Sequence, residues 1–177
     1  MEKPMRNTRK KQGADVNTKD KDGATPMHRA AEEGHVETMR WLKEQGADIN
    51  AKAKNGMTPM HVAADVGHVD VMKWLKEQGA DVKATTENGL TPMHQAAIGG
   101  HVEIMKWLKE QGADINVKNV NGVTPIHSAA FGGHVDVMKW LKKQGVDVNV
   151  KSNFGVTPLA AASTDEAKAW LLANGAE

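Results

Sequence analysis

Apolar residues recur along this chain with the spacing of an α-helix. Within residues 35–46, Val36, Met39, Trp41 and Leu42 fill a wide arc of such a helix. Charged side chains occupy the positions between them and fall on the opposite face. The segment is therefore predicted to be an amphipathic helix that buries one face.

The residues just before it predict a shorter helix. Thr25 can cap a helix through its hydroxyl, and Pro26 suits the first helical position, where a missing N–H breaks no bond. The pair Ala30-Ala31 lets a neighbouring backbone approach closely, and Gly34 can take the positive φ that ends the helix. We expect a helix of about two turns followed by the amphipathic one.

These two patterns return every 33 residues. Each copy starts at a Thr-Pro pair, and the dipeptides Asp-Gly or Asn-Gly, which favour tight reversals, precede the first four copies. A period of this length is typical of solenoids, in which each repeat buries its apolar face only against its neighbours. We number the predicted units 1 to 5, and their bounds are 20–52, 53–85, 86–118, 119–151 and 152–177.

The complete unit resembles the ankyrin repeat. A turn, Gly-x-Thr-Pro-Met-His-x-Ala-Ala, Gly-His, an amphipathic helix and Gly-Ala-Asp-x-Asn follow in that order, and the pattern extends over residues 13–177. The resemblance implies an all-α fold, a solenoid of stacked helix-turn-helix units with turn or β-hairpin fingers. It also implies a concave face, formed by the fingers and the first helices, that contacts protein partners.

Both ends depart from the repeat. Residues 1–19 are predicted to be a basic tail with the remnant of a truncated repeat, because Thr8 and Arg9 stand where other units have Trp and Leu. A frayed tail is the alternative, although the phrase from Gly13 to Asn17 is intact. Unit 5 is three residues shorter between its threonine and its last glycine than unit 4, and it lacks the Gly-Gly-His sequence. It is predicted to be a C-terminal capping repeat.

Composition and charge narrow the function classes. The chain has no Cys, which excludes disulfides and thiolate metal sites. Lys and Arg total 23 against 22 Asp and Glu, so the net charge does not favour nucleic acid as a partner. We see neither a signal peptide nor an apolar run long enough to span a membrane, and a cytoplasmic protein that does not contact the membrane is the default expectation.

Residues that suggest chemistry also follow the repeat. The eight His residues recur one unit apart instead of converging, so we predict hydrogen-bonding roles and no metal site. No phosphate-binding or hydrolase motif occurs, so we predict no cofactor and no enzymatic activity. One Trp per unit is predicted to lie in the core, and the lysines of the second helices, which alternate with acidic residues, are predicted to form a solvated face. The tryptophans are Trp41, Trp74, Trp107, Trp140 and Trp170.

The positions that vary between units are the candidates for partner binding. They lie just after the turn glycine, at the finger tip and at the end of the first helix, and they are acidic in the early units and apolar in the later ones. The resemblance implies that these positions line the concave face. They would then form an apolar groove beside an acidic entrance. The alternative is that Ile98 and Phe131 pack locally between repeats. The candidate residues are Glu32, Glu33, Asp65, Val66, Leu90, Ile98, Val120, Val123, Phe131 and Phe154.

The sequence thus predicts a non-catalytic protein–protein interaction scaffold. Its expected partner is a peptide or helix with apolar and basic residues. We expect a monomer, with association through the poorly capped N-terminal repeat as the alternative. Other interpretations are a repeat fragment of a larger multidomain protein, a designed or consensus-like repeat protein without a natural partner, and a nucleic-acid-binding or enzymatic role.

Overall fold

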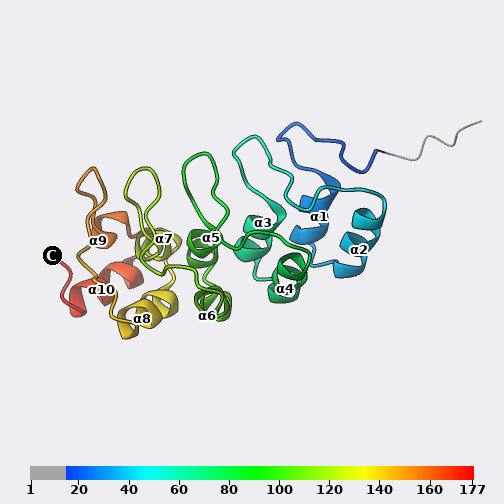
Figure 1. The fold of residues 1–177 in the computed structure, drawn as a ribbon. Helices are drawn as coiled ribbons and strands as arrows, with labels where there is room; N and C mark the ends of the chain where they lie inside the picture. The colour runs from blue at the N-terminus through cyan, green and yellow to red at the C-terminus, as the bar shows by residue number, and fades with distance from the viewer. Residues whose placement is uncertain (1–14) are drawn as a thin grey trace, which may run out of the picture.

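The fold is a row of stacked helix pairs with loops extending from one side (Figure 1). The computed structural model describes residues 15–177, and the predicted remnant repeat falls largely on residues outside that range. The first helices of the units form one layer: α1 (Pro26–Glu32), α3 (Pro59–Val66), α5 (Pro92–Ile98), α7 (Pro125–Gly132) and α9 (Pro158–Ala161). The second helices form the other layer: α2 (Val36–Glu44), α4 (Val69–Glu77), α6 (Val102–Glu110), α8 (Val135–Lys143) and α10 (Asp165–Ala173).

The first helix of each unit begins at its threonine, as the sequence predicts. In unit 1 the backbone N–H of Thr25 donates to Nδ1 of His28 at 3.1 Å, so the histidine takes part in capping the helix. Ala160 occupies the histidine position of unit 5, and there the hydroxyl of Thr157 accepts the amide of Ala160 at 3.3 Å. The shortest first helix, α9, is also the one that lacks this histidine.

The fingers are turns, and no strand is assigned within residues 15–177. Each turn contains a glycine in the left-handed region, such as Gly56 with φ of 81°. A Cβ at Gly56 would meet the backbone nitrogen of Glu87 at 2.6 Å, so only glycine fits between neighbouring fingers. Adjacent fingers are joined by backbone hydrogen bonds, for example from Glu87 N–H to the Asn55 carbonyl at 3.1 Å. These bonds hold the fingers in register with the helices below them.

The core runs the length of the stack between the two helix layers. Paired alanines such as Ala63 and Ala64 are fully buried in the first helices, and methionines such as Met60 and Met72 fill the space between the layers. Small residues allow the first helices of successive units to pack closely. Each unit therefore contributes one thin slice of a continuous core.

The tryptophans do not share one environment. Trp74 is only 3% exposed, whereas Trp107 and the tryptophans of units 4 and 5 are half-buried. Trp41 is 53% exposed, so the prediction that it lies in the core is wrong. The reason is its position in unit 1, where none of the described residues forms a preceding unit that would cover it.

Candidate functional site

The predicted apolar residues of the later units meet at one cavity. Its volume is about 330 Å³, and it lies between α5, α7, α9 and the fingers of units 4 and 5. We call this cavity the apolar groove. Five of the candidate residues line it, together with Asn121, His127, Ser128, Ser152, Val156 and Ala161, which were not among the candidates. The five are Leu90, Ile98, Val123, Phe131 and Phe154.

Two aromatic rings at this groove are exposed to solvent. Phe131 is 61% exposed at the end of α7, and Phe154 is 77% exposed on the finger of unit 5. Ile98 is half-buried, so the alternative of local packing applies to Ile98 in part and does not describe Phe131. Val120 is exposed but does not line the groove; its backbone joins the neighbouring fingers instead.

A second cavity lies over units 1 and 2. Its volume is about 260 Å³, and Glu32, Asp65 and Val66 line it together with Asp22 and Met57. We call it the acidic pocket. Glu33 does not belong to this pocket, because it lines a separate cavity on the outer face of unit 1. The structure thus separates two carboxylates that are adjacent in the sequence.

Arg29 also lines the acidic pocket and was missing from the sequence-based candidates. Its guanidinium donates to Glu32 at 2.8 Å and to Asp20 at 2.6 Å. Arg29 and Glu32 are three residues apart on one helix, and this spacing is the sequence signal from which the pair could have been predicted. Glu32 therefore already has a cationic partner within the chain.

Two carboxylates of the pocket, Asp22 and Asp65, have no such partner among the described residues. Asp22 is exposed, whereas Asp65 is half-buried and no described residue donates a hydrogen bond to its side chain. Burial raises the pKa of Asp65, because the charged form loses solvation. A cation or hydrogen-bond donor from outside the chain would compensate for that loss.

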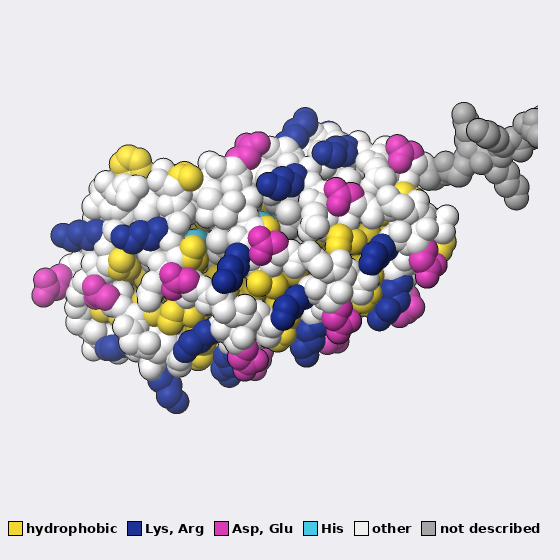
Figure 2. Space-filling model, viewed as in Figure 1, with side chains coloured by type: hydrophobic (Ala, Val, Ile, Leu, Met, Phe, Trp, Pro, Cys, Tyr) yellow, Lys and Arg dark blue, Asp and Glu magenta, His cyan; other side chains and the backbone are white. Residues whose placement is uncertain are grey.

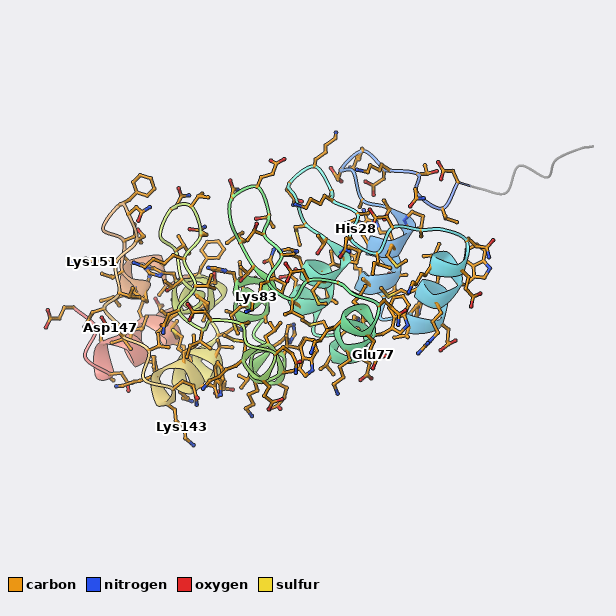
Figure 3. All side chains as sticks on the ribbon, in the orientation of Figure 1. His28, Glu77, Lys83, Lys143, Asp147 and Lys151 are labelled. Atoms are coloured by element: carbon orange, nitrogen blue, oxygen red, sulfur yellow. The ribbon has the colours of Figure 1, made fainter. Side chains whose placement is uncertain are left out.

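The histidines have structural partners one unit apart. His28 lies on α1 (Figure 3), and its Nε2 is 3.0 Å from the carbonyl oxygen of Met57. Nε2 of His68 lies 3.0 Å from the carbonyl oxygen of Glu32. Burial lowers the pKa of the first-helix histidines, and the pKa of His61 falls to about 4. Within residues 15–177 no group of three or more His, Cys, Asp or Glu side chains is arranged to hold a metal ion.

The second helices carry charges of both signs. Figure 2 shows Lys and Arg alternating with Asp and Glu along their row, and apolar side chains at finger tips of the C-terminal units. Lys106 pairs with Glu103 at 2.6 Å, and Lys109 donates to Gln144 of the next unit at 2.7 Å. This mixed row matches the solvated face that the sequence predicts.

None of the helices in the described part of the chain is long and apolar enough to cross a membrane.

Comparison with known proteins assigns the family. A search of curated proteins found no significant match. The family model described as ankyrin repeats (3 copies) matches residues 7–86, 52–119, 73–152 and 94–177, which together cover nearly the whole chain. The unit length, the paired helices and the fingers agree with this match, and the chain belongs to the ankyrin repeat family.

Proposed function

We propose that this chain is a non-catalytic scaffold that binds a segment of another protein on the face formed by the fingers and first helices. Ankyrin repeats are generally protein–protein interaction modules. The observation that carries the proposal is the exposure of Phe131 and Phe154 at the rim of the apolar groove. Exposed aromatic side chains beside a cavity are typical of interface anchors.

The groove favours a bulky apolar side chain of the partner. Its lining is mainly aliphatic and aromatic, and Ser128 and Asn121 are among the residues that supply polar groups. Burial of one Leu- or Phe-sized side chain contributes about 1.5–3 kcal/mol. Since the helices and fingers that line the groove are held by the repeat packing, little ordering entropy opposes binding.

Asp65 favours a basic group elsewhere on the same partner. Its half-buried carboxylate has no donor among the described residues, whereas Glu32 is already paired with Arg29. A lysine or arginine of the partner would supply the missing counter-charge. The sequence assigns the contact with basic residues of the partner to Glu32, Glu33 and Asp65 together. In this proposal Asp65 makes the principal contact.

Selection of peptides from a randomised display library on the immobilised full chain tests the proposal. We expect enriched peptides that combine an apolar anchor with a basic residue. Their binding should fall at least tenfold on Phe131→Asp and should persist on Leu172→Asp, a matched exposed apolar position outside the groove. On Asp65→Asn, selection should retain the apolar anchor and lose the basic residue.

Two results would contradict it. Selected peptides that bind wild type and Phe131→Asp equally well would place their site outside the groove. Peptides with the same basic residue after selection on Asp65→Asn would show that Asp65 is not the contact, while leaving the groove in place.

A further inference from the structure

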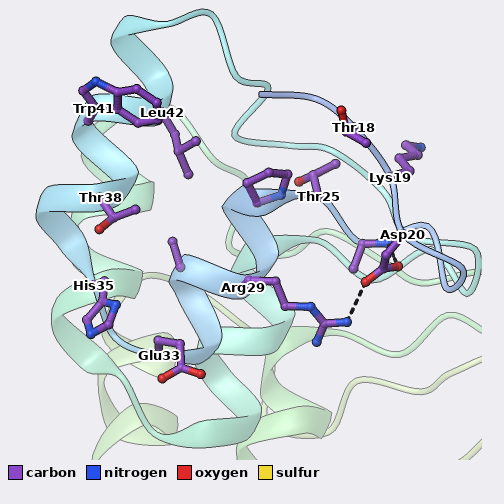
Figure 4. Close-up of a pocket in the computed structure, with 13 residues that line it drawn as sticks. Thr18, Lys19, Asp20, Thr25, Arg29, Glu33, His35, Thr38, Trp41 and Leu42 are labelled. Carbon is purple, nitrogen blue, oxygen red and sulfur yellow. Dashed lines mark hydrogen bonds and ion pairs between the residues drawn. The ribbon is translucent and has the colours of Figure 1, made fainter. Parts of the chain in front are cut away.

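The tryptophan of unit 1 is exposed, whereas the tryptophans of the interior units are buried or half-buried. Units 1 and 5 lie at opposite ends of the stack (Figure 1). The outer face of unit 1 holds a cavity of about 620 Å³, lined largely by apolar groups, among them Pro26 and Ala30. Trp41 and Leu42 contribute to the same lining (Figure 4). Arg29 and Asp20 at its edge are paired with each other at 2.6 Å, so their charges do not oppose an apolar neighbour.

Interior units show what normally covers this face. The guanidinium of Arg40 lies 5.9 Å from the ring centroid of Trp74, and Lys43 donates to Gln78. Glu44 lines the same small cavity as Trp74. Between units 1 and 2, Arg40 thus lies over the tryptophan of the next unit, and Lys43 and Glu44 line the same cavity as that tryptophan.

In unit 5 these three positions are apolar. Alignment of Trp170 with Trp140 places Ala169, Leu172 and Ala173 there, and all three are exposed, Leu172 by 58%. Units 1 to 4 have charged residues at every one of these positions. They are Arg40, Lys73, Lys106 and Lys139 at the first, Lys43, Lys76, Lys109 and Lys142 at the second, and Glu44, Glu77, Glu110 and Lys143 at the third.

This change is opposite to the one expected for a capping repeat. The last unit of a solenoid normally presents a more polar outer face, because nothing packs against it. Here the positions that, between units 1 and 2, line a cavity with the tryptophan of the next unit have no charge, and Trp41 of unit 1 is exposed. The two exposed faces are therefore complementary in position and in polarity.

We propose that copies of this chain associate head to tail, with Trp41 of one copy packed against Ala169, Leu172 and Ala173 of another. The contact continues the stacking order of the interior units. His35 belongs to the same face, since the corresponding His68 donates to a carbonyl of the preceding unit.

An arrangement of this kind is heterologous. Each copy uses two different faces, so the association produces open chains instead of a closed dimer. The apolar groove shares no lining residue with the cavity of unit 1, and it does not include Ala169, Leu172 or Ala173. Head-to-tail association is therefore independent of partner binding in the groove.

Sedimentation velocity of the full chain at increasing concentration tests the association. We expect the weight-average sedimentation coefficient of wild type to rise with concentration. Trp41→Glu and Leu172→Glu should each remain at the monomer value, and Val120→Glu, an exposed apolar position on a finger, should behave as wild type. Far-UV circular dichroism and urea unfolding check that the variants fold, which we expect because both side chains are more than half exposed.

Mixing the two end variants distinguishes head-to-tail pairing from other modes. Trp41→Glu retains the C-terminal face and Leu172→Glu retains the N-terminal face, so the mixture should form a 1:1 dimer and nothing larger. A wild-type protein that stays monomeric at every concentration overturns the proposal. If Trp41→Glu abolishes association and Leu172→Glu does not, two N-terminal faces pair with each other. If association survives both substitutions, the contact lies elsewhere. Either result also overturns the proposal.

Discussion

Nε2 of His61 lies 3.1 Å from the carbonyl oxygen of Leu90 in the next unit. On the other side of the ring, Nδ1 accepts the backbone N–H of Thr58 at 3.3 Å. Because an amide N–H only donates and a carbonyl only accepts, the ring is neutral with its proton on Nε2. A second proton on Nδ1 would remove the bond to Thr58. The same arrangement recurs in units 1, 3 and 4.

This relationship predicts that acid destabilises the fold below neutral pH. Burial lowers the pKa of the four first-helix histidines in the folded state, to about 4 for His61, so the unfolded chain binds protons first. Their stabilisation is present in full above about pH 6.5 and is lost as pH falls toward about 4. Urea unfolding at a series of pH values should show a loss of up to about 1.4 kcal/mol per pH unit for each histidine.

Two variants serve as controls for the pH dependence. His61→Gln should lower the free energy of unfolding at pH 7. It should also reduce the slope of that free energy against pH by the contribution of one histidine. Val120→Gln, at an exposed position on a finger that does not titrate, should leave the slope unchanged. A stability that is constant between pH 7 and 5 would refute this account.

The tryptophans predict a graded series of stability losses. Trp74→Ala should lower the free energy of unfolding by about 3–5 kcal/mol, since the ring is fully packed. Trp41→Ala should cost less than about 1 kcal/mol because its ring is mostly exposed, and Trp107→Ala should fall between them. Equal losses in urea unfolding would show that the units cover their tryptophans alike.

Trp74→Phe should be tolerated much better than Trp74→Ala. The buried Nε1–H of Trp74 has no hydrogen-bond partner among the described residues. Its removal relieves a penalty of about 1–3 kcal/mol, which offsets the lost ring contacts. We expect a net change within about 1 kcal/mol by urea unfolding. A loss comparable to that of Trp74→Ala would indicate that the indole N–H is satisfied in solution.

Substitution of Gly99 or of Gly79 by alanine should destabilise the fold, for a different reason at each position. A Cβ at Gly99 would collide with the carbonyl oxygen of Asp65, although the φ of Gly99, −81°, is ordinary. Gly79 has φ of 93° and open space around it. Gly99→Ala should cost about 1–3 kcal/mol through overpacking between units 2 and 3. Gly79→Ala should cost about 1–2 kcal/mol through backbone strain alone.

Amide hydrogen exchange separates the two causes. Gly99→Ala should increase exchange where α3 and α5 meet, whereas Gly79→Ala should affect only its own loop. An unchanged exchange pattern at α3 and α5 in Gly99→Ala would mean that the close approach is not maintained.

The rim of the groove should be replaceable without loss of stability. Phe131→Asp is expected to change the free energy of unfolding by no more than about 0.5 kcal/mol, because the ring is largely exposed. Ile98→Asp should cost more, since its side chain is half-buried. A large loss in Phe131→Asp, measured by urea unfolding, would favour local packing of Phe131 over availability for a partner.

The local structure could be predicted from the sequence because its causes are local. Thr25 and Pro26 start a helix, Gly34 ends it, and the period of 33 residues places the later helices as far as α9. The groove residues of the later units could also be predicted from the sequence, since their positions vary while the repeat around them is constant. The pairing of Arg29 with Glu32 could also be predicted from their spacing of three residues on one helix, whereas the pairing of Arg29 with Asp20 depends on the fold of the finger.

The tertiary structure decided what depends on a neighbouring unit. Trp41 and Trp74 occupy the same position in their repeats, yet within residues 15–177 only Trp74 has a preceding unit that covers it. Glu33 is adjacent to Glu32 in the chain but points to another cavity. A repeat determines its own helices by itself, whereas burial, pairing and exposure arise between units, where stacking brings together residues that are distant in the chain.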